Sequence, residues 1–322
     1  MKNYDIITIG SASLDVFVRT KHRYSVIKIK KEEDVCYPIG TKILINELYQ
    51  EIGGGGTNTA TAFSRMGFKT AYFGAVGDDF NGKSIIDSLK KEKIDFLGSA
   101  KRGKSGFSTI LIGIEHDRTI MTYKGVNDDL RFSRFNQKPK WIYMSSLTGK
   151  AFNELFKFAS YCRKNSIKYA FNPSAYIAEK GIRKLKGIIQ GCNILVLNFE
   201  EAQLLLGNLN LNQLLKGLKK YVEIAVITDG RKGAYAYDGR KKYTLIPRKI
   251  KVVETTGAGD SFASGFVAGM ILKNDIKYAL QLGLAEAESV IQYIGAKNKL
   301  LSLKEAERII RKPAKIIEEV CA

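Results

Sequence analysis

The sequence predicts an α/β fold, with a doubly wound, mostly parallel sheet flanked by helices and a small antiparallel β lid. From residue 138 onward, short apolar runs alternate with helical patterns, which is typical of repeated βαβ units. We expect strands at residues 141–144, 169–171, 194–197 and 224–228, and helices at residues 150–163, 177–188 and 211–219. Strands at residues 5–9 and 70–75, separated by a helix near residues 58–66, are expected to join the same sheet.

Two stretches interrupt this alternation and predict the lid. Residues 14–20 and 42–51 lack a helical crossover, and residues 107–114 are followed closely by residues 118–124 across the turn Glu115-His116-Asp117. Such ribbons pair antiparallel, and lids of this kind close over a site to exclude water. We therefore expect one domain over residues 1–322, with a lid formed by segments near 12–52 and 105–125.

Bulk composition is that of a globular protein. The chain of 322 residues is 45% hydrophobic and 26% charged, and none of its apolar runs approaches the roughly 18 residues of a membrane span. The N-terminus reads as a strand rather than a secretory signal, so we expect a cytoplasmic protein. The scattered cysteines favour reduced thiols over a disulfide framework or zinc site: Cys36, Cys162, Cys192 and Cys321.

The net charge of +20 is the unusual bulk property. Because the cationic residues are spread along the whole chain, they favour a solvated surface over a nucleic-acid site. A positive field still attracts anionic nucleotides. A nucleic-acid-binding or sugar-sensing protein without catalytic activity is the remote alternative to an enzyme.

A glycine-rich segment near the C-terminus carries the strongest chemical signal, Val252-Val253-Glu254-Thr255-Thr256-Gly257-Ala258-Gly259-Asp260-Ser261-Phe262. We expect a strand, a turn and then a helix through residues 263–272. The turn glycines let the backbone approach a ligand, and free N–H groups at a helix start bind anions such as a phosphoryl group. Asp260 can there accept a proton from an attacking hydroxyl, although an aspartate in such a turn can also simply cap the helix.

A second glycine cluster lies on the N-terminal side, Gly53-Gly54-Gly55-Gly56-Thr57-Asn58-Thr59-Ala60. It leaves main chain bare of side chains, and Asn58 offers both a donor and an acceptor, as recognition of sugar hydroxyls needs. Alone, this cluster is also consistent with a flexible hinge. Asp15 follows the first strand and is either a ligand contact or a turn residue bonded to its own backbone.

These two segments together resemble the signatures of the ribokinase-like, or PfkB, carbohydrate kinase family. The resemblance runs from Asp5 to about residue 311 and implies an ATP-dependent phosphotransferase. It implies that Asp260 is the base and that the amides from Gly257 through Ala258 and Gly259 to Asp260 form an anion hole, with Thr256 near the nucleotide phosphates. On the acceptor side it implies contacts from Asp15, Gly54, Gly55 and Asn58.

The resemblance extends to the nucleotide side. Asn198-Phe199-Glu200-Glu201 matches an Asn-x-x-Glu element, which implies Asn198 beside the phosphates and Glu201 near Mg²⁺; the other reading is a helix start whose acids complement its dipole. The loop from Thr228 to Gly233 resembles the nucleotide-facing loop, with Thr228, Gly230 and Gly233 as contacts. Residues 282–294 read as a helix, and residues 295–298 as the loop that closes the adenine and cation pockets. Glu254 stands where the family usually has Asp, which puts activation by K⁺ in doubt.

The acceptor is the least determined feature, because the family covers several kinds of hydroxyl compound. Gly55 stands where ribokinase-like and phosphofructokinase-like members often carry Lys, which disfavours a phosphorylated sugar. Lys104, Arg118 and Lys124, near the second ribbon, keep such an acceptor open. Tyr123, Phe107 and Met121 are able to stack on a base or a sugar face. We favour a free pentose or ketohexose, with a nucleoside kinase as the alternative. The polar insertion at residues 21–40 leaves open a homodimer contact through the lid.

Overall fold

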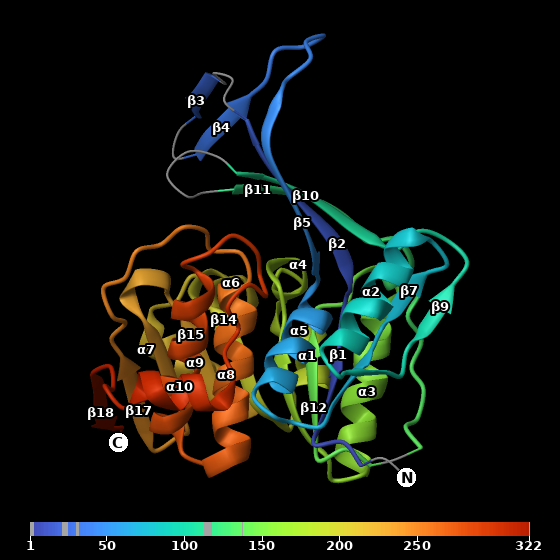
Figure 1. Ribbon diagram of the computed structural model, residues 1–322. Coiled ribbons are helices and arrows are strands. Elements are labelled where there is room, and N and C mark those ends of the chain that lie inside the picture. The colour runs from blue at the N-terminus through green and yellow to red at the C-terminus, as the bar shows by residue number, and fades with distance from the viewer. Residues whose placement is uncertain (1–2, 21–24, 30–31, 113–117, 137, 322) are drawn as a thin grey trace.

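The computed structural model describes residues 3–20, 25–29, 32–112, 118–136 and 138–321. Within them, ten strands form the main sheet in the order β18-β17-β16-β15-β14-β13-β12-β1-β6-β8 (Figure 1). Their bounds are β1 (Ile6–Ile9), β6 (Thr70–Phe73), β8 (Asp95–Phe96), β12 (Trp141–Ser145), β13 (Lys168–Asn172), β14 (Cys192–Asn198), β15 (Val222–Thr228), β16 (Ala234–Tyr237), β17 (Lys241–Leu245) and β18 (Ile316–Val320). The pairs from β8 to β15 are parallel, and β16, β17 and β18 extend the sheet antiparallel.

Strand β1 marks the point where the direction of winding reverses. The chain builds outward from β1 to β6 and β8, then returns to the other side of β1 with β12 and continues outward to β15. Doubly wound sheets bind ligands beside such a reversal, at the carboxyl ends of the strands. The strand order alone therefore predicts a ligand site at the carboxyl ends of β1 and its neighbours.

Helices cover both faces of the sheet. One apolar core packs Ile7 and Ile9 against α3 (Phe152–Lys164), α4 (Ala175–Ala178), α5 (Gly181–Ile189), α6 (Phe199–Leu206) and α7 (Leu211–Lys219). The other packs Ile6 against α1 (Gly55–Arg65), α8 (Ala258–Lys273), α9 (Ile276–Val290) and α10 (Leu303–Ile310). Neighbouring residues of β1 enter different cores because successive side chains of a strand point to opposite faces. This confirms the predicted fold class.

A second sheet rises from the main body as the lid (Figure 1). Within the described residues its strands follow the order β11-β10-β2-β5, with β2 (Ser13–Thr20), β5 (Ile45–Gly53), β10 (Gly106–Ile112) and β11 (Arg118–Tyr123). The pairs β2–β5 and β10–β11 are antiparallel as expected, but β10 runs parallel to β2. The lid is therefore a mixed sheet, while the expected turn at residues 115–117 lies outside the described residues.

Shorter elements complete the fold. The hairpin of β3 (Ser25–Ile29) and β4 (Glu32–Cys36) lies within the predicted insertion, of which residues 21–24 and 30–31 are outside the described part. Helix α2 (Phe80–Lys91) packs beside β7 (Ala75–Gly77), which pairs with β9 (Ser99–Lys101). The 3₁₀ turns among the described residues are η2 (Gly125–Asp129), η3 (Gly149–Ala151) and η4 (Gly230–Lys232). No helix in the described ranges is long and apolar enough to span a membrane.

Four expected elements need correction. Residues 252–254 form no strand, because the N–H groups of Val253 and Glu254 donate to Ile291 O, at the end of α9, instead of to a neighbouring strand. Helix α8 already begins at Ala258, and the helix expected at 282–294 is α9, which ends at Val290. The helix expected at 177–188 is divided into α4 and α5, and Gly181, the first residue of α5, has a φ of +75°.

Helices α8 and α9 approach closely because both carry small residues at their contact. A Cβ added to Gly265 would lie 2.8 Å from Gly283 Cα and 2.9 Å from Leu282 O. These neighbours are backbone atoms, which cannot move aside as the end of a side chain can. Glycine at this position therefore sets the distance between α9 and the helix that carries Asp260.

We expect Gly265→Ala to destabilise the protein by about 1–3 kcal/mol, the usual effect of overpacking a core. Gly217→Ala on α7 is the matched control, because its added methyl group meets only the flexible end of Leu206, at 2.9 Å. That control should be neutral or stabilising by up to about 1 kcal/mol. Urea unfolding of the variants measures the difference, and equal stabilities would contradict the close contact of α8 and α9.

Candidate active site

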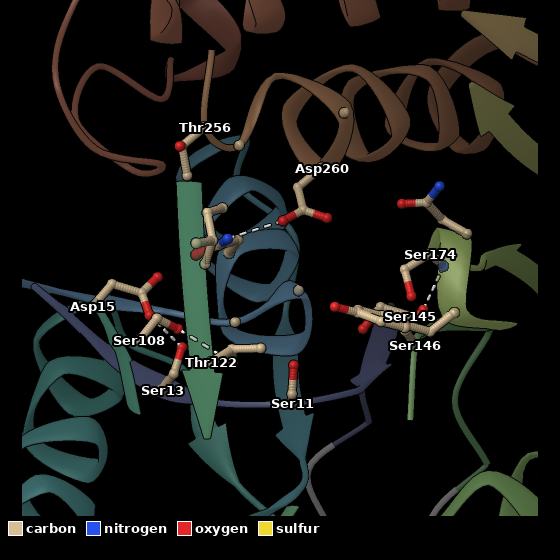
Figure 2. Close-up of a pocket in the computed structure, with 18 of the residues that line it drawn as sticks. Ser11, Ser13, Asp15, Ser108, Thr122, Ser145, Ser146, Ser174, Thr256 and Asp260 are labelled. Atoms are coloured by element: carbon tan, nitrogen blue, oxygen red, sulfur yellow. Dashed lines mark hydrogen bonds between the residues drawn. The ribbon is translucent and has the colours of Figure 1, made fainter. Parts of the chain in front are cut away.

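A cleft of about 520 Å³ lies at the carboxyl ends of the parallel strands. The last residues of β12, β13, β14 and β15 all line it, and they are Ser145, Asn172, Asn198 and Thr228. The lid contributes residues of β2, β10 and β11 to the opposite wall. Figure 2 shows Asp260 pointing into this space, with Asp15, Ser13 and Ser108 on one side and Ser145, Ser146 and Ser174 on the other.

The start of α8 is held in place by a left-handed glycine. Gly257 is the N-cap residue with a φ of +79°, a conformation that other residues rarely adopt. A Cβ there would also lie 2.6 Å from the Cβ of Ala296 in the loop after α9. Glycine at position 257 therefore permits both the left-handed backbone and the close approach of Ala296. Asp260 follows in the first turn of the helix.

Asp260 is held by a hydrogen bond from the other glycine-rich helix. Asn58 Nδ2, on α1, donates to Asp260 Oδ2 at 2.9 Å. Asp260 is enclosed by protein apart from the side that faces the cleft, and this burial raises the pKa of its carboxyl, with the nearby Asp15 acting in the same direction. The Asn58 bond opposes the shift by stabilising the ionised form. A carboxylate of raised pKa beside a substrate cleft is suited to accept a proton.

Backbone donors surround the same point. Gly259 and Asp260 lie in the first turn of α8, where helical N–H groups have no acceptor within their own helix. Ala258 N–H differs, since it donates to Thr255 O at 3.2 Å, and Ala258 does not line the cleft. Of the amides named from the sequence, those of Gly257, Gly259 and Asp260 thus belong to cleft-lining residues.

Asp15, near the start of β2, lies on the lid side of the cleft and is only 8% exposed. Ser13 Oγ donates to Asp15 Oδ1 at 2.7 Å. Burial raises the pKa of Asp15, while the hydroxyls of Ser13 and Ser108 and the charges of Lys297 and Lys124 act against the rise. Asp15 is thus a buried, bonded carboxylate and not a solvated turn residue.

The first glycine cluster connects the lid to α1. Gly54 has a φ of +96°, and a Cβ on it would lie 2.5 Å from Ser11 O. Gly55 opens α1, where a Cβ would lie 3.0 Å from Ser145 Oγ and 3.5 Å from Asp260 Oδ1. Bare backbone at Gly55 therefore leaves room beside Asp260 for an acceptor. Asn58 also lines the cleft, and its Oδ1 is buried without a protein partner among the described residues.

The Asn198 and Glu201 pair forms a capping box at the start of α6. Asn198 Oδ1 accepts from Glu201 N–H at 2.7 Å, and Glu201 Oε2 accepts from Asn198 N–H at 2.9 Å. Both residues also line the cleft. Burial raises the pKa of Glu201 to about 7, with the charge of Asp260 adding to the rise. Asn198 and Glu201 therefore cap the helix and also face the cleft, so a capping role and a role in ligand binding are compatible.

Glu254 is buried directly before the turn that leads into α8 and is only 1% exposed. Its Oε1 accepts from Thr256 N–H at 2.5 Å and lies 3.4 Å from Arg118 Nε of the lid strand β11. Arg118 Nη1 also donates to Thr255 Oγ1. The sequence raised Arg118 only as a cation near the acceptor and did not connect it to Glu254.

Several expected residues lie outside the cleft. Gly230 and Gly233 do not line it; Gly233 N–H donates to Gly230 O at 3.1 Å, and Gly233 packs against Leu245 O, where a Cβ would lie at 2.0 Å. Lys104, Phe107 and Met121 are also absent from its walls, whereas Arg118, Tyr123 and Lys124 line it. The site roles of Gly230 and Gly233 stay predictions.

The sequence reading missed most of the small polar side chains of the cleft, which are Ser11, Ser13, Ser108, Thr122, Asn127, Ser145, Ser146, Asn172 and Ser174. Ser145 and Asn172 could have been predicted to line the cleft, because each stands at the end of a predicted buried strand. Asn127 had no such signal, since it acts by bonding both the N–H and the C=O of Ala12, each at 2.9 Å. It thereby fixes the loop between β1 and β2.

Comparison with known proteins agrees with this geometry. A family described as "pfkB family carbohydrate kinase" matches residues 27–303. Ribokinase of Bacillus subtilis is 27% identical over 318 residues, which cover 95% of this chain and 99% of that protein. Two solved structures share the fold. Adenosine kinase from Sinorhizobium meliloti has a TM-score of 0.80 at 21% identity, covering 95% and 98% of the two chains. Arabidopsis thaliana ribokinase, solved with ribose and ATP, has a TM-score of 0.78 at 19% identity, covering 96% and 99%.

The fold and the cleft thus define a phosphotransferase that acts on a hydroxyl group. The chain belongs to the pfkB family of carbohydrate kinases, and its activity is that of a sugar or nucleoside kinase. The resemblance drawn from the two glycine-rich segments is therefore confirmed.

The sequence predicts that Asp260 is the base, which acts only when ionised, and its pKa is raised. We therefore expect the acid limb of the profile, where the rate falls, to lie at a pH above the range of an ordinary carboxylic acid. Asn58→Ala removes the bond that favours the ionised form and should move this limb upward by about 0.5–1 pH unit. Ser64→Ala is the control on the same helix, since Ser64 bonds Glu92 O at 2.6 Å, outside the cleft lining. Profiles of kcat/KM measure the shift, and an unmoved limb for Asn58→Ala would contradict the role of this bond.

Proposed function

We propose that this protein phosphorylates a hydroxyl of a free pentose or ketohexose with ATP. The observation that carries the proposal is the convergence at Asp260 of a partly buried carboxylate of raised pKa, the first turn of α8 and the Asn58 side chain. Small polar groups on the acceptor side of the cleft, including Ser11, Ser13 and Ser108, suit a polyhydroxyl compound.

In the proposed reaction, Asp15 and Asn58 hold the acceptor between the lid and α1. The buried Oδ1 of Asn58, which has no protein partner among the described residues, is available to an acceptor hydroxyl. Asp260 takes the proton as the hydroxyl oxygen attacks the γ-phosphorus, and the bond from that phosphorus to the ADP oxygen breaks. The N–H groups of Gly257, Gly259 and Asp260 stabilise the charge that spreads over the phosphoryl oxygens.

On the nucleotide side we propose Thr256, Asn198 and Thr228 as contacts, with Gly230 and Gly233 shaping the loop beyond them. Glu201 is an oxygen donor of the type that Mg²⁺ prefers, and no cluster of three or more acidic, His or Cys ligands occurs in the described part of the chain. A single carboxylate fits a Mg²⁺ ion carried by the triphosphate and held through water. Bound there, Mg²⁺ would neutralise phosphate charge.

A nucleoside is the second candidate acceptor. Tyr123 and Tyr176 line the cleft while 57% and 61% exposed, so both rings are accessible for stacking on a base. A phosphorylated sugar has less support, because Arg118 is engaged with Glu254 and Thr255, and burial lowers the pKa of Lys124.

We further propose that the chain works as one kinase domain whose lid sheet forms a homodimer contact. Apolar side chains are exposed on the lid strands, among them Leu48 and Tyr49 of β5 and Ile120 and Met121 of β11. These strands are the two edges of the lid sheet, and exposed apolar side chains at a sheet edge are able to contact a second copy of the chain. The positive net charge, in contrast, is not needed for the proposed chemistry.

We expect the purified protein with Mg-ATP to phosphorylate at least one acceptor from a panel of free pentoses, ketohexoses, nucleosides and phosphorylated sugars. Asp260→Asn removes the base while keeping the shape, and should lower kcat by about 10²–10⁴-fold. Coupled measurement of ADP release gives both results. Wild-type turnover in Asp260→Asn would refute the assignment of the base. Salt-sensitive binding of DNA or RNA without turnover across the panel would favour the non-catalytic alternative.

Dependence on K⁺ gives a separate test. Glu254 Oε2 and Thr256 Oγ1 are buried without partners among the described residues, and oxygens of this type fit a monovalent cation. The guanidinium of Arg118 already balances the single charge of Glu254, however. We therefore expect the same kcat in K⁺ and in tetramethylammonium buffers. Strong activation by K⁺ would show that a bound cation, rather than Arg118, supplies the balancing charge.

A further inference from the structure

Arg118 connects the lid to the segment that leads into the anion-binding turn. It is the first residue of β11, its side chain is 24% exposed, and it lines the cleft. Its guanidinium reaches Glu254 and Thr255, which lie far away in the sequence and belong to the body of the protein. This contact therefore joins two parts that a moving lid would separate.

A single oxygen of Glu254 interacts both with Arg118 of the lid and with the backbone of the body. Glu254 Oε1 lies 3.4 Å from Arg118 Nε and accepts the N–H of Thr256 at 2.5 Å. Thr256 immediately precedes Gly257, the N-cap of α8, and Thr255 O accepts the N–H of Ala258. The position of the guanidinium is thus linked, through a single buried side chain, to the backbone that begins the anion hole.

The same lid sheet carries the acceptor groups. Strand β11 pairs with β10, where Arg118 lies opposite Ile112, and β10 pairs in turn with β2, where Ser108 lies beside Asp15. Hydrogen-bonded strands move together, so an acceptor held by Asp15 and Ser108 also determines where Arg118 lies. Acceptor binding and the order of the anion-binding turn are consequently connected through continuous contacts.

We propose that Arg118 is a positioning residue that couples acceptor binding by the lid to the alignment of the anion hole, through Glu254. This inference rests on the proposed kinase function. The coupling makes phosphoryl transfer efficient only when the acceptor has closed the lid, and it thereby disfavours transfer to water. It requires no contact between Arg118 and the substrate.

The experiment is a double-mutant cycle measured with Mg-ATP in tetramethylammonium buffer, which holds no K⁺ or Na⁺ to take the place of the guanidinium. Arg118→Ala and Glu254→Gln should each lower kcat by roughly tenfold or more, as small misalignments of reacting groups do. ATP affinity should change little, and the acceptor-stimulated rate should fall relative to ATP hydrolysis by water. The double variant should be no slower than the slower single variant, and Arg118→Lys should recover part of kcat.

Arg19→Ala is the matched control. Arg19 lies on the same lid sheet in β2 and forms an ion pair with Glu47 at 3.0 Å, so its loss removes a lid cation without touching Glu254. Its kcat should match the wild type. Effects of Arg118→Ala and Glu254→Gln that simply multiply, or a wild-type kcat in Arg118→Ala, would overturn the proposal while leaving the kinase function intact.

A second measurement does not depend on turnover. Amide hydrogen exchange of residues 106–112 and 118–123 should be faster in Arg118→Ala than in the wild type or Arg19→Ala, because the lid loses its attachment to the body. Unchanged exchange would overturn the proposal even if no acceptor in the panel is phosphorylated. Failure of the kinase function itself would appear as an inactive wild type.

Discussion

The meeting of two glycine-rich helix starts is the constraint on which the site depends. Helices α1 and α8 come from distant parts of the chain, and the bond from Asn58 to Asp260 joins their first turns. Both helix starts are crowded positions, since a Cβ on Gly55 would lie 3.0 Å from Ser145 Oγ and one on Gly257 would lie 2.6 Å from the Cβ of Ala296. The carboxylate, its amide donor and the helix N–H groups then occupy one small volume. The proposed base and anion hole both depend on that geometry.

Around this centre, the main sheet and the lid each form one wall of the cleft. The parallel strands end at one edge, so a single polar residue at each end, such as Asn172 or Thr228, contributes to one wall. The lid supplies Asp15 and Ser108 from neighbouring strands to the other wall. Burial on both sides raises the pKa of the carboxyls that face the cleft, which favours proton transfer near neutral pH.

Local patterns in the sequence were sufficient to predict the fold class and to single out Asp260 and Asn58, which the structure brings together at one cleft. The buried runs of β12 to β15 are continuous apolar segments, and the glycines around Asp260 and Asn58 mark close backbone approach within a few residues. The pairing of Arg118 with Glu254 left no local trace, because it joins a lid strand to a distant loop. The strand predicted at 252–254 was wrong for a related reason: the N–H groups of this segment donate to Ile291 O, at the end of α9, which is also distant in the sequence.

The connection between β5 and α1 also bears on how such a lid can be exchanged. Gly54 alone separates the last residue of β5 from the first of α1. One residue inserted there would rotate the start of α1 by about 100° relative to the lid, because a helix has 3.6 residues per turn. Asn58 would then point away from Asp260. A lid grafted from another kinase could therefore transfer its acceptor preference only if the length of this joint were kept.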